Sequence, residues 1–222
     1  MTKQLNNDIT MIKIGVISQK GGVGKSSTAR LIAANGAISE LECKIIDLDI
    51  QQGTCTTWNA RRMQNQIEPH ISVEQFPTVN AAIKKSNGYD LVIFDGSPHA
   101  TKQTLEVAKV CDLVVIPTGT SLDDLEPTVL LCHELKAKGV DKGKIFVLLN
   151  KVGTSTAELE EAKEYLLRSQ YNYLKNHIPE KTAIRRALDS GRCANETDFK
   201  TVNETVQKVM DELSVLINET IK

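Results

Sequence analysis

Three uninterrupted apolar runs most strongly constrain how this chain of 222 residues can fold. They are LVIFD at 91–95, LVVIP at 113–117 and IFVLLN at 145–150. Such runs, without polar alternation, are typical of strands buried on both faces of a sheet. Helical patterns separate them from one another and from the shorter apolar runs. This alternation predicts βαβ units, and therefore a doubly wound α/β fold with a mainly parallel sheet and helices on both faces.

The remaining elements are expected to continue that alternation. We expect strands at 11–18, 43–49, 71–76, 89–96, 111–118, 144–152 and near 171–178, and helices at 26–41, 55–64, 78–86, 125–138 and 157–170. No repeat, low-complexity stretch or linker divides the chain, so residues 1–222 are interpreted as one domain. The polar residues 1–10 are expected to form a flexible tail.

The C-terminal segment has the pattern of a helix that packs against the rest of the chain. Its apolar residues recur at helical spacing: Phe199, Val202, Val206, Val209, Leu213 and Leu216. Its polar face mixes acids and amides with few lysines, whereas a helix that binds a membrane surface needs a basic face. We therefore expect no membrane partner.

Composition narrows the class of protein further. With 41% hydrophobic residues, 25% charged residues and a net charge of −1, the chain has no global basic excess, although a local basic face remains open. The five cysteines are scattered without a C-x-x-C pair, which argues against a zinc or iron–sulfur site within one chain and against a disulfide framework. No signal peptide or membrane-spanning run is found. A cytoplasmic protein with reduced thiols is the expectation.

The segment ISQKGGVGKSSTA at 17–29 follows an apolar strand and precedes a helix, which is the context of a phosphate-binding loop. Its glycines let backbone N–H groups turn toward an anion at a helix N-terminus. The predicted nucleotide-binding residues are Gly21, Gly22, Val23, Gly24, Lys25, Ser26 and Ser27. Lys25 would reach the β- and γ-phosphates, the Ser26 hydroxyl would ligate Mg²⁺, and Ser27 could bond the α-phosphate.

The loop departs from the G-x-x-x-x-G-K-[ST] pattern because Gln19 replaces its first glycine and Lys20 follows. A lysine in this place resembles the deviant Walker A ATPases of the ParA/MinD superfamily. The resemblance implies that Lys20 contacts the phosphates of the partner chain in an ATP-bound homodimer. Two facing ATP molecules concentrate negative charge, so a cation from each subunit would make dimerisation depend on nucleotide. The alternative for Lys20 is a solvated surface cation.

Three carboxylates end predicted strands, where ligands bind in sheets of this kind. Asp47 and Asp49 share one side by the period of two, and Asp95 ends a later strand. By the resemblance, Asp49 would position the attacking water, Asp47 would support the Mg²⁺ shell through water, and Asp95 would match Walker B and support Mg²⁺. These parts serve phosphoryl transfer by positioning and charge neutralisation, with Lys20, Lys25 and Asp49 as the catalytic set. A helix cap or turn acid is the alternative for each carboxylate.

Two further polar residues are weaker candidates. Asn150 ends the strand at 144–152, and the resemblance places it on the adenine edge; a strand-end turn asparagine is the alternative. Asp124 falls near the nucleotide in related proteins, although an acid that favours a helix N-terminus explains it nearly as well.

Two segments are similar to those of the small, ParF-like (type Ib) plasmid partition ATPases. Residues 51–62, QQGTCTTWNARR, resemble a PQGS…W stretch with Gln51 in place of proline, and residues 178–197 resemble a basic helix before a D-x-G turn. The predicted DNA-binding residues there are Lys181, Arg185, Arg186 and Arg192. Residues 181 and 185 would share a helical face that binds DNA phosphates without sequence preference. A solvated charged helix is the alternative.

The resemblance implies a nucleoid-associated cytoplasmic ATPase that uses ATP and Mg²⁺. It would dimerise on ATP, bind DNA non-specifically, and hydrolyse ATP when a centromere- or cargo-binding adaptor stimulates it. Three alternatives stay open. They are the same ATPase positioning a non-DNA cargo, a catalytically idle nucleotide-gated scaffold, and a membrane-cycling regulator of the division site.

Overall fold

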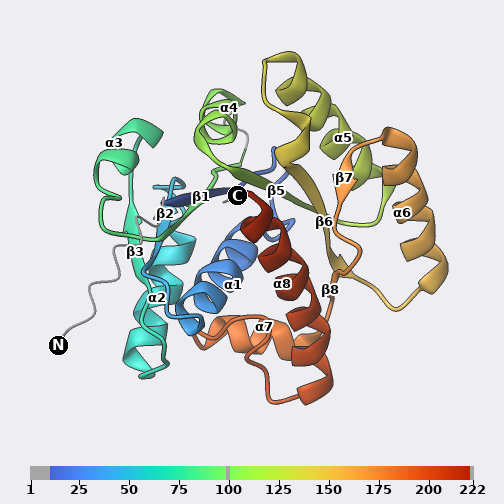
Figure 1. Cartoon of the computed structure of the whole chain (residues 1–222). Helices are drawn as coiled ribbons and strands as arrows, with labels where there is room; N and C mark the ends of the chain where they lie inside the picture. Colours follow the sequence, from blue (N-terminus) through green and yellow to red (C-terminus); the bar gives the residue numbers. More distant parts are fainter. Residues whose placement is uncertain (1–10, 99–100, 221–222) are drawn as a thin grey trace.

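A parallel sheet forms the centre of the chain in the computed structural model, which describes residues 11–98 and 101–220 (Figure 1). Its strands are β1 (Ile12–Val16), β2 (Cys43–Asp47), β3 (Ser72–Gln75), β4 (Leu91–Asp95), β5 (Leu113–Thr118), β6 (Ile145–Val152), β7 (Asn172–Tyr173) and β8 (Ile178–Pro179). The order is β3-β2-β4-β1-β5-β6-β7, with β8 beside β6, and these pairings are parallel. The predicted α/β fold is confirmed.

Helices cover both faces of this sheet. They are α1 (Lys25–Ile38), α2 (Thr54–Gln64), α3 (Val79–Lys84), α4 (Thr101–Val110), α5 (Leu122–Ala137), α6 (Thr156–Ser169), α7 (Thr182–Asp189) and α8 (Lys200–Thr220), with a 3₁₀ turn at Lys142–Lys144. One core lies under α1, α2, α7 and α8, and a second core lies under α3 to α6 on the opposite face. Alternate strand residues enter the two cores, as the continuous apolar runs predict: Leu91 and Ile93 enter one, and Val92 and Phe94 the other.

The structure corrects the predicted elements in three places. Helix α4 was not expected, although its buried residues Thr104, Val107 and Ala108 recur at helical spacing. The expected last strand is two short strands, β7 and β8, which pair with different parts of β6. Phe199 precedes α8 and is 59% exposed, so the prediction that it packs is wrong, whereas Val206, Val209 and Leu213 are buried. The predicted tail at 1–10 lies outside the described residues.

Strand register brings the expected acidic residues to one edge. Asp95 is the register partner of both Asp47 on β2 and Val16 on β1, where the glycine loop begins. After β4 the chain crosses β1 to build the other half of the sheet. The loop and the acidic residues therefore meet at a topological switch point, at the carboxyl ends of the strands, where such sheets bind ligands.

Candidate functional site

The glycine loop between β1 and α1 is shaped for a group that approaches the backbone closely. Gly22 and Gly24 have positive φ values of 77° and 95°, which L side chains rarely adopt. A Cβ atom on Gly24 would also collide with the side-chain amide of Asn150. Helix α1 begins directly after Gly24, so the free N–H groups of its first turn face the loop. These features fit an anion such as a phosphate.

Lys25 holds a cation inside this loop. Its side chain is buried, with the residue 7% exposed, and Nζ donates to the backbone carbonyl of Lys20 at 3.0 Å. Burial lowers the pKa of Lys25, and the charges of Asp95 and Asp49 oppose that shift. A buried ammonium with carboxylates nearby is well placed to receive phosphate oxygens.

The three predicted carboxylates meet at the floor of the site but occupy different environments. Asp47 is fully buried, and its oxygens accept from the backbone N–H groups of Asp49 (3.1 Å), Cys55 (3.1 Å) and Thr56 (3.4 Å). Burial raises the pKa of Asp47, and these hydrogen bonds oppose the shift. Asp49 lies beyond the end of β2, half-buried, and lines the cleft above. Asp47 therefore holds the turn that presents Asp49.

Asp95 is the acidic group that fits a divalent cation. It is 2% exposed, and its Oδ1 atom is buried without a hydrogen-bond partner in the described structure. Burial raises the pKa of Asp95 to about 6, against hydrogen bonds from Ser26 and Cys55 that lower it. A hydroxyl and a carboxylate side by side, with one oxygen unused, are oxygen ligands of the kind that Mg²⁺ takes. Ser26 and Asp95 could thus hold that ion.

The raised pKa of Asp95 predicts that this group destabilises the empty fold. The folded chain binds the proton more tightly than the unfolded chain, whose aspartate has the ordinary value of 3.8. Stability from the proton is therefore complete below about pH 4 and is lost as pH rises through about 6. Without metal or nucleotide, Asp95→Asn should raise the free energy of unfolding by roughly 1–3 kcal/mol at about pH 8, and by about half as much at about pH 5.

Urea denaturation at the two pH values measures this difference. Asp211→Asn, which changes an exposed aspartate on α8, is the control and should show no such gain. Equal stability of wild type and Asp95→Asn at the higher pH would contradict the inferred cost of the buried charge.

Asn150 braces the loop from β6. It is buried, its Nδ2 atom donates to the carbonyl of Val23 at 2.9 Å, and its Oδ1 atom accepts from the Lys151 backbone. Lys151 adds a second contact, from Nζ to the carbonyl of Gly22 at 2.6 Å. Asn150 also lines the cleft, and its predicted contact with the adenine edge stays a prediction. Sequence reasoning did not find the support that both residues give the loop.

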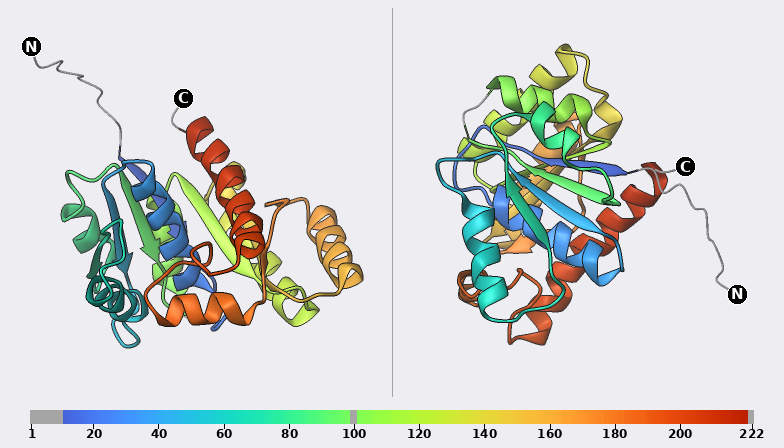
Figure 2. Two further views of the ribbon diagram at one scale, coloured as in Figure 1. Left: turned by 90° about the horizontal axis from the view of Figure 1, so that it is seen from below. Right: turned by 90° about the vertical axis from the view of Figure 1, so that its left-hand side faces the viewer.

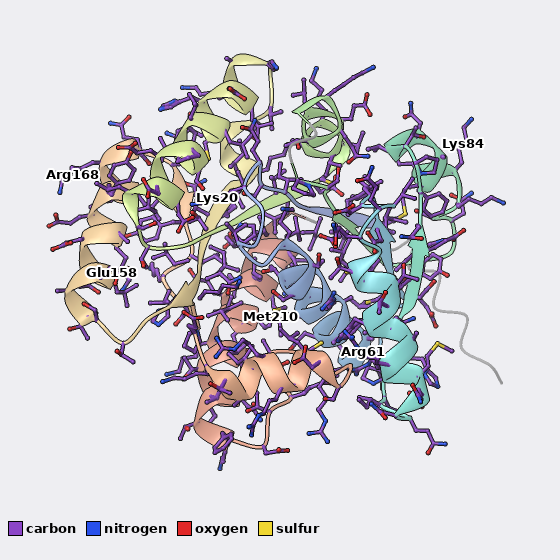
Figure 3. All side chains as sticks on the ribbon, turned by 180° about the vertical axis from the view of Figure 1, so that it is seen from behind. Lys20, Arg61, Lys84, Glu158, Arg168 and Met210 are labelled. Carbon is purple, nitrogen blue, oxygen red and sulfur yellow. The ribbon has the colours of Figure 1, made fainter. Side chains whose placement is uncertain are left out.

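Lys20 does not point into its own site. Its Nζ atom forms an ion pair with the Asp124 carboxylate and donates to the carbonyl of Asp123 at 3.0 Å, beside α5 (Figure 3). Ser121 also donates to Asp124, at 2.9 Å. Asp124, a weak candidate for a place near the nucleotide, therefore holds the lysine at the N-terminal end of α5. The Lys20 side chain remains 41% exposed at the mouth of the loop.

A cleft of about 660 Å³ extends from the loop to the segment that joins β8 and α7. Its walls include Asp49, Gly96 and Pro179, together with two of the predicted DNA-binding residues, Lys181 and Arg185. This cleft leaves room beside the phosphate site for the rest of a nucleotide.

The predicted basic set is divided between two clefts. Arg186 and Arg192 line a second cleft of about 570 Å³, which Lys181 also borders. Helix α7 begins at Thr182, so Lys181 is its N-cap and lies just outside the helix, although Lys181 and Arg185 line the same nucleotide cleft. These four basic side chains are exposed. Arg185 pairs with Glu180 at 3.0 Å, and Arg192 pairs with Asp198 at 3.0 Å.

Helix α2 is joined tightly to the segment that carries Arg192, a connection not predicted from the sequence. Arg62 is 1% exposed and donates to both oxygens of Glu196, at 2.8 and 3.0 Å. It also donates to three backbone carbonyls, including that of Gly191. Trp58 Nε1 donates to the Arg192 carbonyl at 2.9 Å. We call these contacts the α2 clamp; Figures 1 and 2 show α2 and α7 side by side.

The fold and the glycine loop together define a P-loop nucleotide-binding protein. The profile of the CobQ/CobB/MinD/ParA nucleotide binding domain matches residues 14–194. The chain therefore belongs to this family of nucleotide-binding NTPases.

Comparisons with individual proteins agree with this membership. The chain is 31% identical over 121 residues to the maintenance of carboxysome distribution protein A of Gloeobacter kilaueensis, which covers 54% of this chain and about half (55%) of that relative. The cell division ATPase MinD of Pyrococcus furiosus shares the fold, with a TM-score of 0.73 at 17% identity over 92% of this chain and 99% of that one. A putative plasmid partition protein of Borrelia burgdorferi bound to AMPPNP gives 0.71 at 14% identity, over 93% and 99%.

Proposed function

We propose that the chain is a Mg²⁺-dependent ATPase of the deviant Walker A type that dimerises on ATP and moves a cargo over DNA. The position of Lys20 carries this proposal. The lysine leaves its own phosphate loop, stands exposed at the loop mouth and is held by groups at the start of α5. A cation in that place can reach the phosphates of a second chain that docks face to face. Residues 1–222 would act as one domain.

Each residue of the site then has a physical task in phosphoryl transfer. The loop N–H groups and Lys25 would hold the phosphates, with Ser27 near the α-phosphate, while Ser26 and Asp95 would hold Mg²⁺. Bound Mg²⁺ neutralises charge that develops on the phosphate oxygens. Asp49, which lines the cleft, would orient the attacking water. Asp47 would act through the turn that it organises and through water. Asn150 would fix the loop and face the base.

The basic residues around α7 support binding to DNA. We propose that Arg186 and Arg192 contact DNA phosphates, because they are exposed and line the second cleft but not the nucleotide cleft. Lys181, which borders both clefts, would add to this contact. Arg185 lines the nucleotide cleft, so we assign it a smaller part in DNA binding. Binding without sequence preference would place the protein on the nucleoid, and an adaptor bound to cargo would stimulate hydrolysis and release.

The nature of the cargo has two candidates of similar weight. A plasmid partition protein with the same fold favours DNA segregation. The relative named for carboxysome distribution favours the positioning of a large protein assembly by the same kind of ATPase. A membrane-cycling regulator is less favoured, because the terminal helix α8 buries Val206, Val209 and Leu213 and has a mixed polar face. Among the described residues, no helix is long and apolar enough to cross a membrane.

Binding to random-sequence duplex DNA tests the proposed function. With ATP, but not with ADP or without nucleotide, we expect tight binding that weakens steeply as salt rises, because a dimer doubles the basic face. The double variant Arg186→Ala/Arg192→Ala should bind more weakly. It should also lower the slope of log affinity against log salt by roughly one for each DNA phosphate that it no longer neutralises.

The matched control is Arg168→Ala, which removes an exposed arginine of α6 that is paired with Glu164. Its affinity for DNA should match that of the wild type. Absence of DNA binding in every nucleotide state would remove the DNA-based function and leave the assignment as an NTPase in place.

A further inference from the structure

A cysteine thiol lies among the carboxylates at the floor of the site. The Sγ atom of Cys55 and carboxylate oxygens of Asp47 and Asp95 all lie within 4.8 Å of one another, and the three residues are buried. The thiol donates to Asp95 Oδ2 at 3.2 Å and lies 3.7 Å from the Ser26 carbonyl. The magnesium chemistry proposed above needs only oxygen ligands, so it gives this sulfur no task.

One carboxylate oxygen in this cluster of Asp47, Cys55 and Asp95 is available to bind a cation. Asp95 Oδ1, on a residue 2% exposed, has no hydrogen-bond partner in the described structure. A buried carboxylate oxygen without a partner is costly, and a bound cation would satisfy it. Oδ1 belongs to the same Asp95 carboxylate whose Oδ2 atom accepts the hydrogen bond from the Cys55 thiol.

The backbone holds the thiol in place. Cys55 is the second residue of α2, and its N–H donates to Asp47 Oδ2 at 3.1 Å. The α2 clamp fixes the same helix further along. The cluster is therefore preorganised, and it lies beneath the cleft whose walls include Ser26, Asp49 and Gly96.

We propose that Asp47, Cys55 and Asp95 form a binding site for a thiophilic divalent cation such as Zn²⁺ or Cd²⁺. Thiolate ligands select such ions over Mg²⁺, and two carboxylates, one thiolate and a water complete the four positions that Zn²⁺ prefers. The Cys55 thiol releases its proton to solvent as the metal–sulfur bond forms, and no electron is transferred. In the nucleotide-free chain the thiophilic ion binds Asp95 and so competes with Mg²⁺ for this carboxylate. That competition rests on the proposed function, whereas binding of the thiophilic ion does not.

Titration of the reduced, full-length, nucleotide-free chain with Cd²⁺ tests this site through the ultraviolet charge-transfer absorption of the Cd–S bond. We expect one site per chain whose band is absent in Cys55→Ala. Cys132→Ala is the matched control, because Cys132 is equally buried but lies on α5 in the opposite core, and it should keep the band. Asp95→Asn should weaken Cd²⁺ binding by at least about tenfold.

Two results would overturn the proposal: a wild-type chain that binds no Cd²⁺, and a band that survives in Cys55→Ala. Cys55→Ser serves as a second variant if the alanine chain does not fold, because its hydroxyl can still donate to Asp95. It should lose the sulfur band while circular dichroism shows the native fold. This readout needs neither ATP nor DNA, so it can fail or succeed independently of the DNA-binding experiment.

Discussion

A Lys20→Ala chain is expected to bind ADP as the wild type does, yet to remain monomeric with ATP and Mg²⁺. Lys20 makes its side-chain contacts with Asp123 and Asp124 at the start of α5, not with groups inside its own cleft. Its removal therefore leaves the loop and Lys25 in place but takes one cation from each side of the proposed dimer, which would enclose two ATP molecules. Light scattering after size-exclusion chromatography measures the dimer, which should fall to the level seen with ADP.

A substitution of Asp124, the partner of Lys20 in its ion pair, should have the opposite effect on dimerisation. Asp124→Asn removes the acid that holds the lysine in its own chain, so this variant should dimerise at a lower ATP concentration than the wild type. Lys163→Ala, which changes a lysine paired with Glu160 on α6, is the control and should dimerise normally. A normal ATP-dependent dimer in Lys20→Ala would refute the role that we propose for this lysine.

Arg62→Ala should lower the free energy of unfolding by about 3–5 kcal/mol, a large part of the stability of a domain this size. It removes the buried arginine of an ion pair, so the half-buried Glu196 is left without its counter-charge and three backbone carbonyls lose a donor. Unpaired buried polar groups carry the full cost of desolvation. Chemical denaturation at neutral pH, followed by circular dichroism, measures the loss.

The neighbouring arginine provides the control for this substitution. Arg61 lies on the same helix (Figure 3) but forms none of the ion pairs found among the described residues, and Arg61→Ala should cost much less than Arg62→Ala. Replacing both partners, in Arg62→Met/Glu196→Leu, should recover part of the loss because no charge is left unpaired. A change below about 1 kcal/mol in Arg62→Ala would show that the clamp contributes little to stability.

Sequence reasoning succeeded where the signal is local. The glycine loop, Lys25, Asp47 and Asp95 each stand at the end of a strand or the start of a helix, and strand register then brings the acids together. The central strands could be predicted because a strand that is buried on both faces needs a continuous run of apolar residues, which the sequence displays. These features depend on neighbours within a few residues or on a repeating geometry, so a single sequence carries them.

The contacts that escaped prediction join distant parts of the chain. Lys20 and Asp123 are 103 residues apart, and Arg62 and Glu196 are 134 residues apart. No local pattern distinguishes such partners from solvated charges. The DNA-binding set shows the same limit at short range, because adjacent side chains on a helix diverge by about 100° and so Arg185 and Arg186 line different clefts.

The α2 clamp connects helix α2 to both the nucleotide cleft and the proposed DNA-binding face. Its first turn is anchored on Asp47 beside the nucleotide cleft, while Trp58 and Arg62 hold the segment that carries Arg192. If nucleotide binding displaces the first turn of α2, these contacts predict that the segment carrying Arg192 moves with it. Trp58, the chain's single tryptophan, contacts both Arg30 and Arg62, so we expect its fluorescence to report such a movement without an added label.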